Sequence, residues 1–167
     1  PLLVQKRQEI QAMSLPELKN MIKISSLAFN NGGKIPAKYT CDEDNISPPL
    51  NISEIPATTK SLVLIVDDPD APVGIWSHWL VWNISPYTTE ISENSVPSGA
   101  VVGVNDFGNN NYGGPCPPSG THRYFFKIFA LDTILNLPST SKRGDLDAAL
   151  SGHIIDKSEL MGKYSRS

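Results

Sequence analysis

Short apolar runs separated by proline, glycine and asparagine dominate the chain from Ile22 onward, and this pattern limits the folds open to it. The 167 residues include 14 prolines and 12 glycines. These residues interrupt helices and favour turns, so such frequent breaks are typical of an all-β sandwich or barrel. Four runs rich in Val, Ile, Phe, Tyr and Trp predict strands, at 22–29, 61–66, 79–84 and 124–131. We therefore expect a mainly β fold, with a central strand at 61–66, where every residue but the first is apolar.

Helical periodicity is confined to the C-terminal part of the chain. Apolar residues recur at helical spacing at Leu146, Ala149, Leu150 and Ile154, which predicts a short amphipathic helix. His153 falls on the apolar side of this helix and is expected to pack or cap there. A second short helical turn is expected at 158–161, and less than a quarter of the domain should be helical.

The chain has the length of one ordinary domain, which can bury a sizeable core without staples. Residues 1–20 differ from the rest because they carry a loose helical pattern that Pro16 interrupts. We treat them as an N-terminal extension and 21–167 as a single domain. The extension is a tag remnant, a start assigned too early or a native helix, and the sequence does not separate these origins.

Charge and hydropathy exclude several classes of function. The net charge is -3 and the basic residues are scattered, which argues against a nucleic-acid partner. The longest apolar run, 62–66, is far shorter than the roughly 18 residues that span a bilayer, so no transmembrane insertion is expected. Charged residues interrupt the first twenty positions, so we expect a cytoplasmic protein unless a secretory leader preceded this numbering.

Cys41 and Cys116 are the two cysteines of the chain. They form neither a CxxC pair nor a metal spacing with a histidine, and two cysteines make no disulfide framework. Free thiols are therefore the expectation.

A first group of polar residues follows the predicted central strand. The segment 67–72 alternates aspartates with prolines, and each proline moves its preceding residue away from helical geometry. An extended segment would project Asp68 and Asp70 to the same side. The alternative is a solvated turn with an aspartate cap.

A second group lies around the predicted strand 79–84. Strict two-residue alternation would place Trp76, His78, Leu80, Trp82 and Ile84 on one face. On such an apolar face a histidine is either a packed core residue or part of a site.

A third group joins a glycine- and proline-rich loop to the predicted strand 124–131. Alternation places His122, Tyr124, Phe126 and Ile128 on one face, so the first two would mark the polar rim of an apolar surface. Glycines such as Gly114 allow a close approach of the backbone to a ligand, and the neighbouring prolines stiffen the loop.

The combination of these segments resembles the phosphatidylethanolamine-binding family, also called the Raf kinase inhibitor family, in its shorter bacterial and archaeal branch. The matching motifs are DPDAP at 68–72, Trp76 with His78, and the stretch from GPCPP to HRY at 114–124. SPPL at 47–50, GHII at 152–155 and EL at 159–160 match as well, so the resemblance covers roughly 22–166. Asn51 and Glu43 depart from the family pattern, which predicts different loops near the pocket mouth. The long C-terminal helix of many eukaryotic members is absent.

The resemblance implies a central antiparallel β-sheet sandwich with a few short helices and a small cavity near the surface. That cavity accepts phosphate, acetate or a phosphoethanolamine headgroup, with no metal or cofactor, and the bacterial branch suggests a homodimer. Carried over by motif, the residues lining it are Asp68, Asp70, His78, Gly114, Pro115, His122 and Tyr124.

The chemistry of these residues suits an anionic or zwitterionic ligand. The histidines, the Tyr124 hydroxyl and backbone N–H groups near Gly114 can donate hydrogen bonds to an anion. The carboxylates fit if one orients an imidazole and the other faces a ligand ammonium. We therefore expect binding of a small ligand rather than catalysis.

Two alternatives belong to other classes. Two histidines with two carboxylates can hold a metal or run acid/base chemistry, but no nucleophile or motif such as HExxH or GxSxG accompanies them. Inhibition of a serine protease or a kinase is also known in the family, would use exposed loops and is compatible with the pocket.

Overall fold

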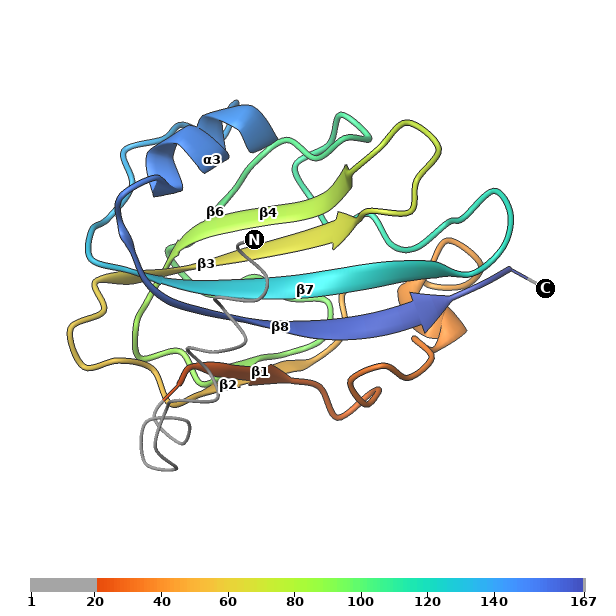
Figure 1. Cartoon of the computed structure of the whole chain (residues 1–167), viewed down its shortest axis with the longest axis horizontal. Coiled ribbons are helices and arrows are strands. Elements are labelled where there is room, and N and C mark those ends of the chain that lie inside the picture. The colour runs from red at the N-terminus through yellow and green to blue at the C-terminus, as the bar shows by residue number, and fades with distance from the viewer. Residues whose placement is uncertain (1–20, 167) are drawn as a thin grey trace, which may run out of the picture.

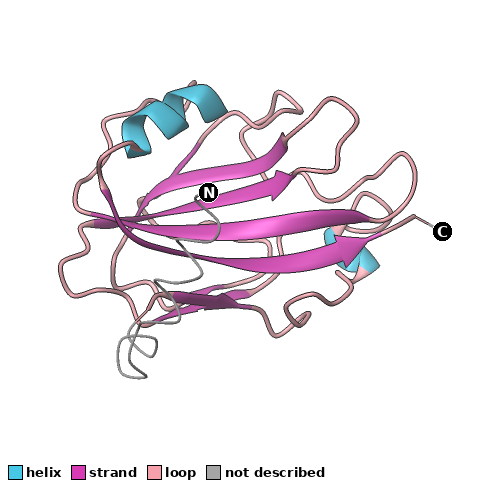
Figure 2. Cartoon of the chain, in the orientation of Figure 1, coloured by secondary structure: helices cyan, strands magenta, loops and turns pink. Residues whose placement is uncertain are grey.

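The protein is described by a computed structural model that covers residues 21–166, and it is mainly β (Figures 1 and 2). In chain order its elements are β1 (Lys23–Ser25), the 3₁₀ helix η1 (Ala37–Tyr39), β2 (Leu50–Ser53), β3 (Ser61–Asp68), β4 (Trp76–Ile84), β5 (Glu90–Ile91), β6 (Val101–Val102), β7 (His122–Leu131), α3 (Arg143–Leu150) and β8 (Ile154–Tyr164).

The strands form two antiparallel sheets. The larger has five strands in the order β6-β4-β3-β7-β8, and the smaller has three in the order β1-β2-β5. Every residue of β3 is buried, so the predicted central strand is confirmed. Figure 1 shows α3 on one side of the larger sheet and β1 and β2 on the other.

Two apolar cores hold these three layers together. One joins the small sheet to the large one, through side chains such as Ile24, Ile52 and Phe126. The other lies under α3, where Leu146 and Leu150 pack against Val63 and Leu80. The larger sheet is therefore buried on both faces around β3.

The predicted common face for β4 is wrong because the strand is interrupted twice. Val66 pairs with Trp79 and Asp67 with Ser77, so His78 is an extra residue on β4, and a second shift lies near Asn83. As a result Leu80 and Trp82 pack under α3, whereas Trp79 joins the core between the sheets. A bulge inserts one extra residue into a strand but leaves no distinct mark in the amino-acid composition. Two-residue alternation alone therefore cannot reveal it.

The C-terminal helix ends earlier than predicted. α3 stops at Leu150, and the residues from Ile154, including the expected turn at 158–161, form β8 instead. β8 pairs with β7 from His122 to Leu131, and this long ladder outweighs the local helical spacing. His153 lies in the turn between α3 and β8, exposed and bonded to Asp132, so its predicted packing role is also wrong.

β8 also joins the beginning of the domain to its end. The N–H of Ile22 donates to the Asp156 carboxylate, and β1 lies beside β8 (Figure 1). Further along, Gly32 and Ile35 donate to the carbonyls of Met161 and Lys163 at 2.7 and 2.8 Å. The outer edge of β8 is thus partly covered by the first described segment.

The two cysteines form a disulfide, which corrects the expectation of free thiols. Cys41, just after η1, is bonded to Cys116 in the loop before β7, across 75 residues of chain. The sheet topology brings the two cysteines together, so their separation in the sequence does not indicate that they are bonded. The predicted extension at 1–20 lies outside the described residues, and no helix within 21–166 is long and apolar enough to span a membrane.

Candidate functional site

A cavity of about 360 Å³ opens where β3 ends and where β4 and β7 begin. Asp68, His78, His122 and Tyr124 line it, so the structure brings together four of the predicted site residues. The other lining residues are Ala71, Pro72, Val73, Trp76, Phe107, Cys116, Pro117 and Pro118. Three strands and two loops therefore contribute to one polar hollow with apolar walls.

Asp68 and His122 form a buried pair at the base of the cavity. The Nδ1–H of His122 donates to Oδ2 of Asp68 at 2.6 Å, and both side chains are less than one tenth exposed. Asp68 is the last residue of β3 and His122 the first of β7, so adjoining strands supply the pair. The carboxylate fixes the ring and leaves its Nε2 as the atom available to a ligand.

His78 faces the same cavity because of the bulge in β4. Its Nδ1–H donates to the carbonyl of Gly113 at 2.6 Å, and its ring meets those of Tyr124 and Phe107 edge-on. Burial lowers the pKa of His78, and the carbonyl bond opposes this only in part. The ring is therefore neutral near pH 7, with its Nε2 free to accept a hydrogen bond.

Two buried donors at the cavity have no partner among the described residues. They are the hydroxyl of Tyr124 and the indole Nε1–H of Trp76. Burial also raises the pKa of Tyr124, which keeps the hydroxyl protonated. Because an unsatisfied buried donor costs about 1 to 3 kcal/mol, a ligand acceptor there would be favourable.

The mouth of the cavity is apolar. Val73 is 78% exposed and Phe107 44% exposed, although both are large hydrophobic residues. Pro72 and Pro118 stand beside them on the surface. A ligand would therefore meet apolar walls first and polar groups at the base.

Three predicted site residues do not line this cavity. Asp70 lies in the turn after β3, where its carboxylate forms two bonds with the Arg123 guanidinium at 2.9 Å. These bonds hold the pKa of Asp70 at about 2. Pro115 is buried in the loop and its carbonyl accepts from the N–H of Cys41.

Gly114 is the third, and its small size serves packing rather than ligand approach. A Cβ at Gly114 would lie 2.5 Å from the carbonyl oxygen of Tyr39. The N–H of Gly114 donates to Oδ1 of Asn45 at 2.8 Å instead of facing the cavity. The glycine thus fixes the loop that carries Cys116.

Sequence reasoning missed Trp76 as a donor and Phe107 and Cys116 as walls. Trp76 belongs to a recognised motif, but a buried, unpartnered N–H is visible only in three dimensions. Phe107 comes from a loop with no motif of its own. The disulfide that brings Cys116 to the cavity could not be inferred from two isolated cysteines.

Asp67 organises the opposite side of the same strand. It is 1% exposed and forms ion pairs with Arg143 of α3 and with Lys127 of β7, the latter at 3.1 Å. Arg143 also donates to the hydroxyl of Ser77, next to His78 in β4. The ion cluster therefore ties α3 to the strand residues that carry the cavity.

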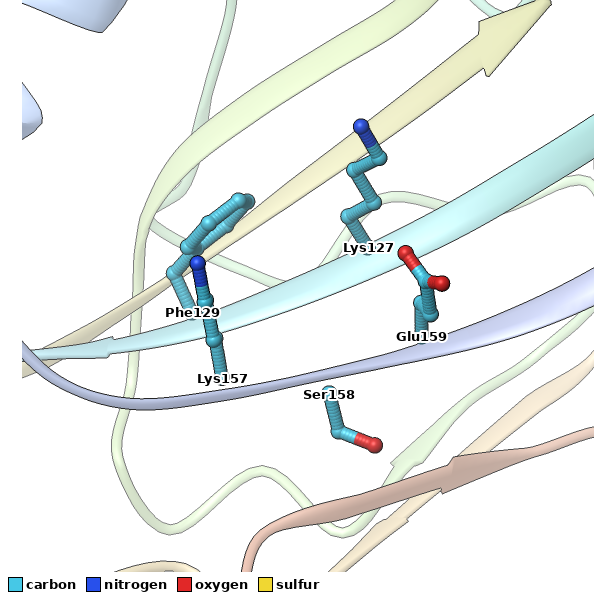
Figure 3. A pocket seen from close by; sticks show the side chains of 5 residues that line it. All are labelled: Lys127, Phe129, Lys157, Ser158 and Glu159. Carbon is cyan, nitrogen blue, oxygen red and sulfur yellow. The ribbon is translucent and has the colours of Figure 1, made fainter. Parts of the chain in front are cut away.

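A separate cavity of about 350 Å³ lies on the outer face of β7 and β8, lined by Lys127, Phe129, Lys157, Ser158 and Glu159 (Figure 3). None of the predicted site residues lines it. Its Lys127 and Glu159 lie directly opposite each other in the β7–β8 ladder, so opposite charges offset one another. Within 21–166, no group of three or more His, Cys, Asp or Glu side chains is placed to hold a metal ion.

A sequence profile described as phosphatidylethanolamine-binding protein matches residues 25–165. The chain belongs to the phosphatidylethanolamine-binding protein family. This confirms the resemblance noted in the motifs, which lie within the matched region.

Relatives and solved structures agree with this membership. A UPF0098 protein of Methanothermobacter thermautotrophicus is 47% identical over 87% of this chain and 99% of the relative. A UPF0098 protein of Archaeoglobus fulgidus is 51% identical over 90% of this chain, and the matched part is 53% of that relative's length.

Two crystal structures are similar as well. CT736 of Chlamydia trachomatis, described as a homolog of phosphatidylethanolamine-binding protein, has a TM-score of 0.85 and 43% identity, covering 89% of this chain and 99% of that one. YbcL of E. coli, described as a member of the mammalian family, has a TM-score of 0.83 and 33% identity, covering 87% and 99%. The predicted sandwich fold is therefore confirmed.

Proposed function

We propose that this family member binds small phosphorylated or otherwise anionic ligands in the cavity at the ends of β3, β4 and β7. The observation that carries the proposal is the pair of buried donors, Tyr124 and Trp76, which have no partner within residues 21–166 and lie beside two oriented histidines. Four polar groups from β4 and β7 thus converge on one hollow.

A phosphate monoanion matches these groups in detail. Its unprotonated oxygens accept from the Tyr124 hydroxyl and the Trp76 indole, and from the Nε2 of His122 when that ring is charged. Its P–OH group donates to the Nε2 of His78, which is an acceptor while that ring is neutral. Acetate offers fewer oxygens and should bind more weakly.

The ammonium end of a phosphoethanolamine headgroup has less support. Asp70 is occupied by Arg123 outside the cavity, and Asp68 is occupied by His122. No other carboxylate lines the cavity among the described residues. We therefore propose recognition of the phosphate end, with the rest of the ligand in contact with the apolar mouth.

Binding is favoured over nucleophilic catalysis by the lining of the cavity. Its described residues include no serine or threonine, and the sulfur of Cys116 is held in the disulfide. A histidine oriented by a carboxylate then has no protein nucleophile to activate. Any effect on a partner protein would follow from ligand occupancy or from the exposed loops at the mouth.

An NMR titration with inorganic phosphate tests the proposal. In the wild type, amide shifts at Gly113, Tyr124 and Trp76 should saturate. Removing one donor to a charged ligand should weaken binding roughly tenfold or more, so Tyr124→Phe and His122→Ala should both lose saturation in the accessible range.

His153→Ala is the matched control, because His153 is an exposed histidine paired with Asp132 away from the cavity. It should bind phosphate as the wild type does. Saturation that persists unchanged in both cavity variants would overturn the assignment, and so would a wild type with no saturable response.

A further inference from the structure

Two smaller hollows lie next to the cavity proposed to bind an anion. The nearer, of about 210 Å³, shares Phe107 and Cys116 with that cavity. The farther, of about 250 Å³, shares Asn45, Asn111 and Tyr112 with the nearer one. Each neighbouring pair of hollows thus shares lining residues, and we refer to the three hollows together as the groove.

The two added hollows are uncharged and lined by amides. No Asp, Glu, Lys, Arg or His lines either of them among the described residues. Asparagines from three loops contribute instead, namely Asn45, Asn94, Asn109, Asn110 and Asn111. This differs sharply from the histidine- and aspartate-based cavity at one end of the groove.

Much of the hydrogen-bonding capacity of these amides is unused within the described residues. The side chains of Asn94 and Asn109 have no hydrogen-bond partner there. Asn45 uses only its oxygen, toward Gly114, and Asn111 uses only its oxygen, toward Asn105. Donors and acceptors thus remain available to an occupant.

The nearer hollow is held rigid from below. Asn105 is 3% exposed and its side chain binds the backbone of Phe107, Asn109 and Asn111 at 2.7 to 3.1 Å. The loop is therefore wound around one buried amide. Such preorganisation lowers the entropic cost of binding.

We propose that an extended peptide segment occupies this groove, with an anionic group in the cavity and its backbone along the asparagines. The inference rests on the proposed function of the cavity. A carboxamide carries one acceptor and one donor group, as a peptide unit does, so it can pair with main chain irrespective of side-chain sequence. The anion is a phosphorylated side chain or a C-terminal carboxylate.

The aromatic residues of the farther hollow favour a peptide over an oligosaccharide. Trp79 and Tyr112 are 1% and 8% exposed, so they offer no open ring face on which a sugar could stack.

Isothermal titration of the whole chain with a ligand series tests the inference. The probes are inorganic phosphate, O-phosphoserine, acetyl-Ala₄-phosphoserine amide, phosphoserine-Ala₄ amide and penta-alanine with a free carboxylate. At least one pentapeptide should bind about tenfold more tightly than O-phosphoserine or phosphate, as two net hydrogen bonds would give. Which one does so identifies the anionic group and the chain direction.

The double variant Asn109→Ala with Asn111→Ala should abolish the extra affinity for the pentapeptide while leaving phosphate affinity unchanged. The control is Asn136→Ala, at an exposed asparagine outside the groove, which should preserve the extra affinity. Phosphate binding without any peptide gain, or a gain that survives the double variant, would overturn the groove and leave the proposed function intact. Tight binding of maltopentaose that the double variant abolishes would overturn the peptide assignment. A wild type that does not bind inorganic phosphate would instead count against the proposed function.

Discussion

At the scale of single residues, Asp67 and Asp68 show how alternation divides two roles between neighbours. They are consecutive in β3, so their side chains face opposite sides of the sheet. Asp68 orients His122 at the cavity, and Asp67 anchors Arg143 beneath α3. Both are buried, but only Asp68 can influence a ligand directly.

Stability and anion binding should both depend on pH through His78. Burial lowers the pKa of His78 from its ordinary value of about 6.5, so the unfolded chain takes up the proton at a higher pH than the folded one. Stability that is present above pH 6.5 should therefore fall as the pH drops toward the folded pKa. A bound dianion favours the charged ring, so it should stabilise the protein more in this acidic window.

Thermal unfolding with and without sulfate at pH 7.5 and 5.5 measures both effects. Sulfate keeps its charge across this range, unlike phosphate. The rise in Tm caused by sulfate should be larger at pH 5.5, and His78→Gln should reduce the difference. Equal rises at both pH values would contradict the role of His78.

At the scale of elements, the sequence predicted those parts where local pattern and tertiary context agree. Continuous apolar residues identified β3, and alternation correctly placed His122 on the face of Tyr124 and Phe126. Alternation failed for Asp70, because β3 ends at Asp68 and a turn follows. Helical spacing gave a wrong prediction for β8, because cross-strand pairing, which acts between distant segments, decided the structure there.

The contact between α3 and β3 should contribute measurably to stability. Arg143→Met removes a partly buried cation from Asp67 but leaves Lys127 as a second partner. We expect a loss of about 2 kcal/mol in the free energy of unfolding. In a domain of this size that lowers Tm by about 4 to 8 °C.

Differential scanning calorimetry measures the change. Arg166→Met is the control, because Arg166 pairs with Asp42 on an exposed surface, where an ion pair contributes at most about 1 kcal/mol. Equal losses of stability in the two variants would show that the ion pair of Arg143 with Asp67 contributes no more than an exposed ion pair.

At the scale of the whole molecule, the disulfide links the first third of the domain to the loop that forms a wall of the cavity. Replacing both Cys41 and Cys116 by serine removes a cross-link over 75 residues, which should cost about 4 kcal/mol. Tm should then fall by roughly 10 °C. Phosphate should also bind more weakly, because Gly113, which orients His78, belongs to the same loop.

Wild-type protein treated with dithiothreitol should reproduce both changes, and the serine variant should not respond to the reductant. Unaltered phosphate affinity in the reduced protein would show that the loop keeps its position without the bond.

Removing residues 1–20 should leave the domain folded. The family match covers residues 25–165 and therefore begins after the removed segment. The shortened chain should unfold in one cooperative transition with the Tm of the full chain to within about 2 °C. A broad transition would show that the extension contributes to the core.

The hydrogen bonds between β8 and the segment 22–35 determine when this protein can finish folding during synthesis. Ile22, Gly32 and Ile35 leave the ribosome early but find their partners only in residues 156–163, which are made after every other described element. Until β8 has been synthesised, the large sheet lacks this edge strand, and β1 of the small sheet lacks β8 as its neighbour. Nascent chains stalled before residue 156 should therefore be open to proteases and chaperones, however complete their first strands are.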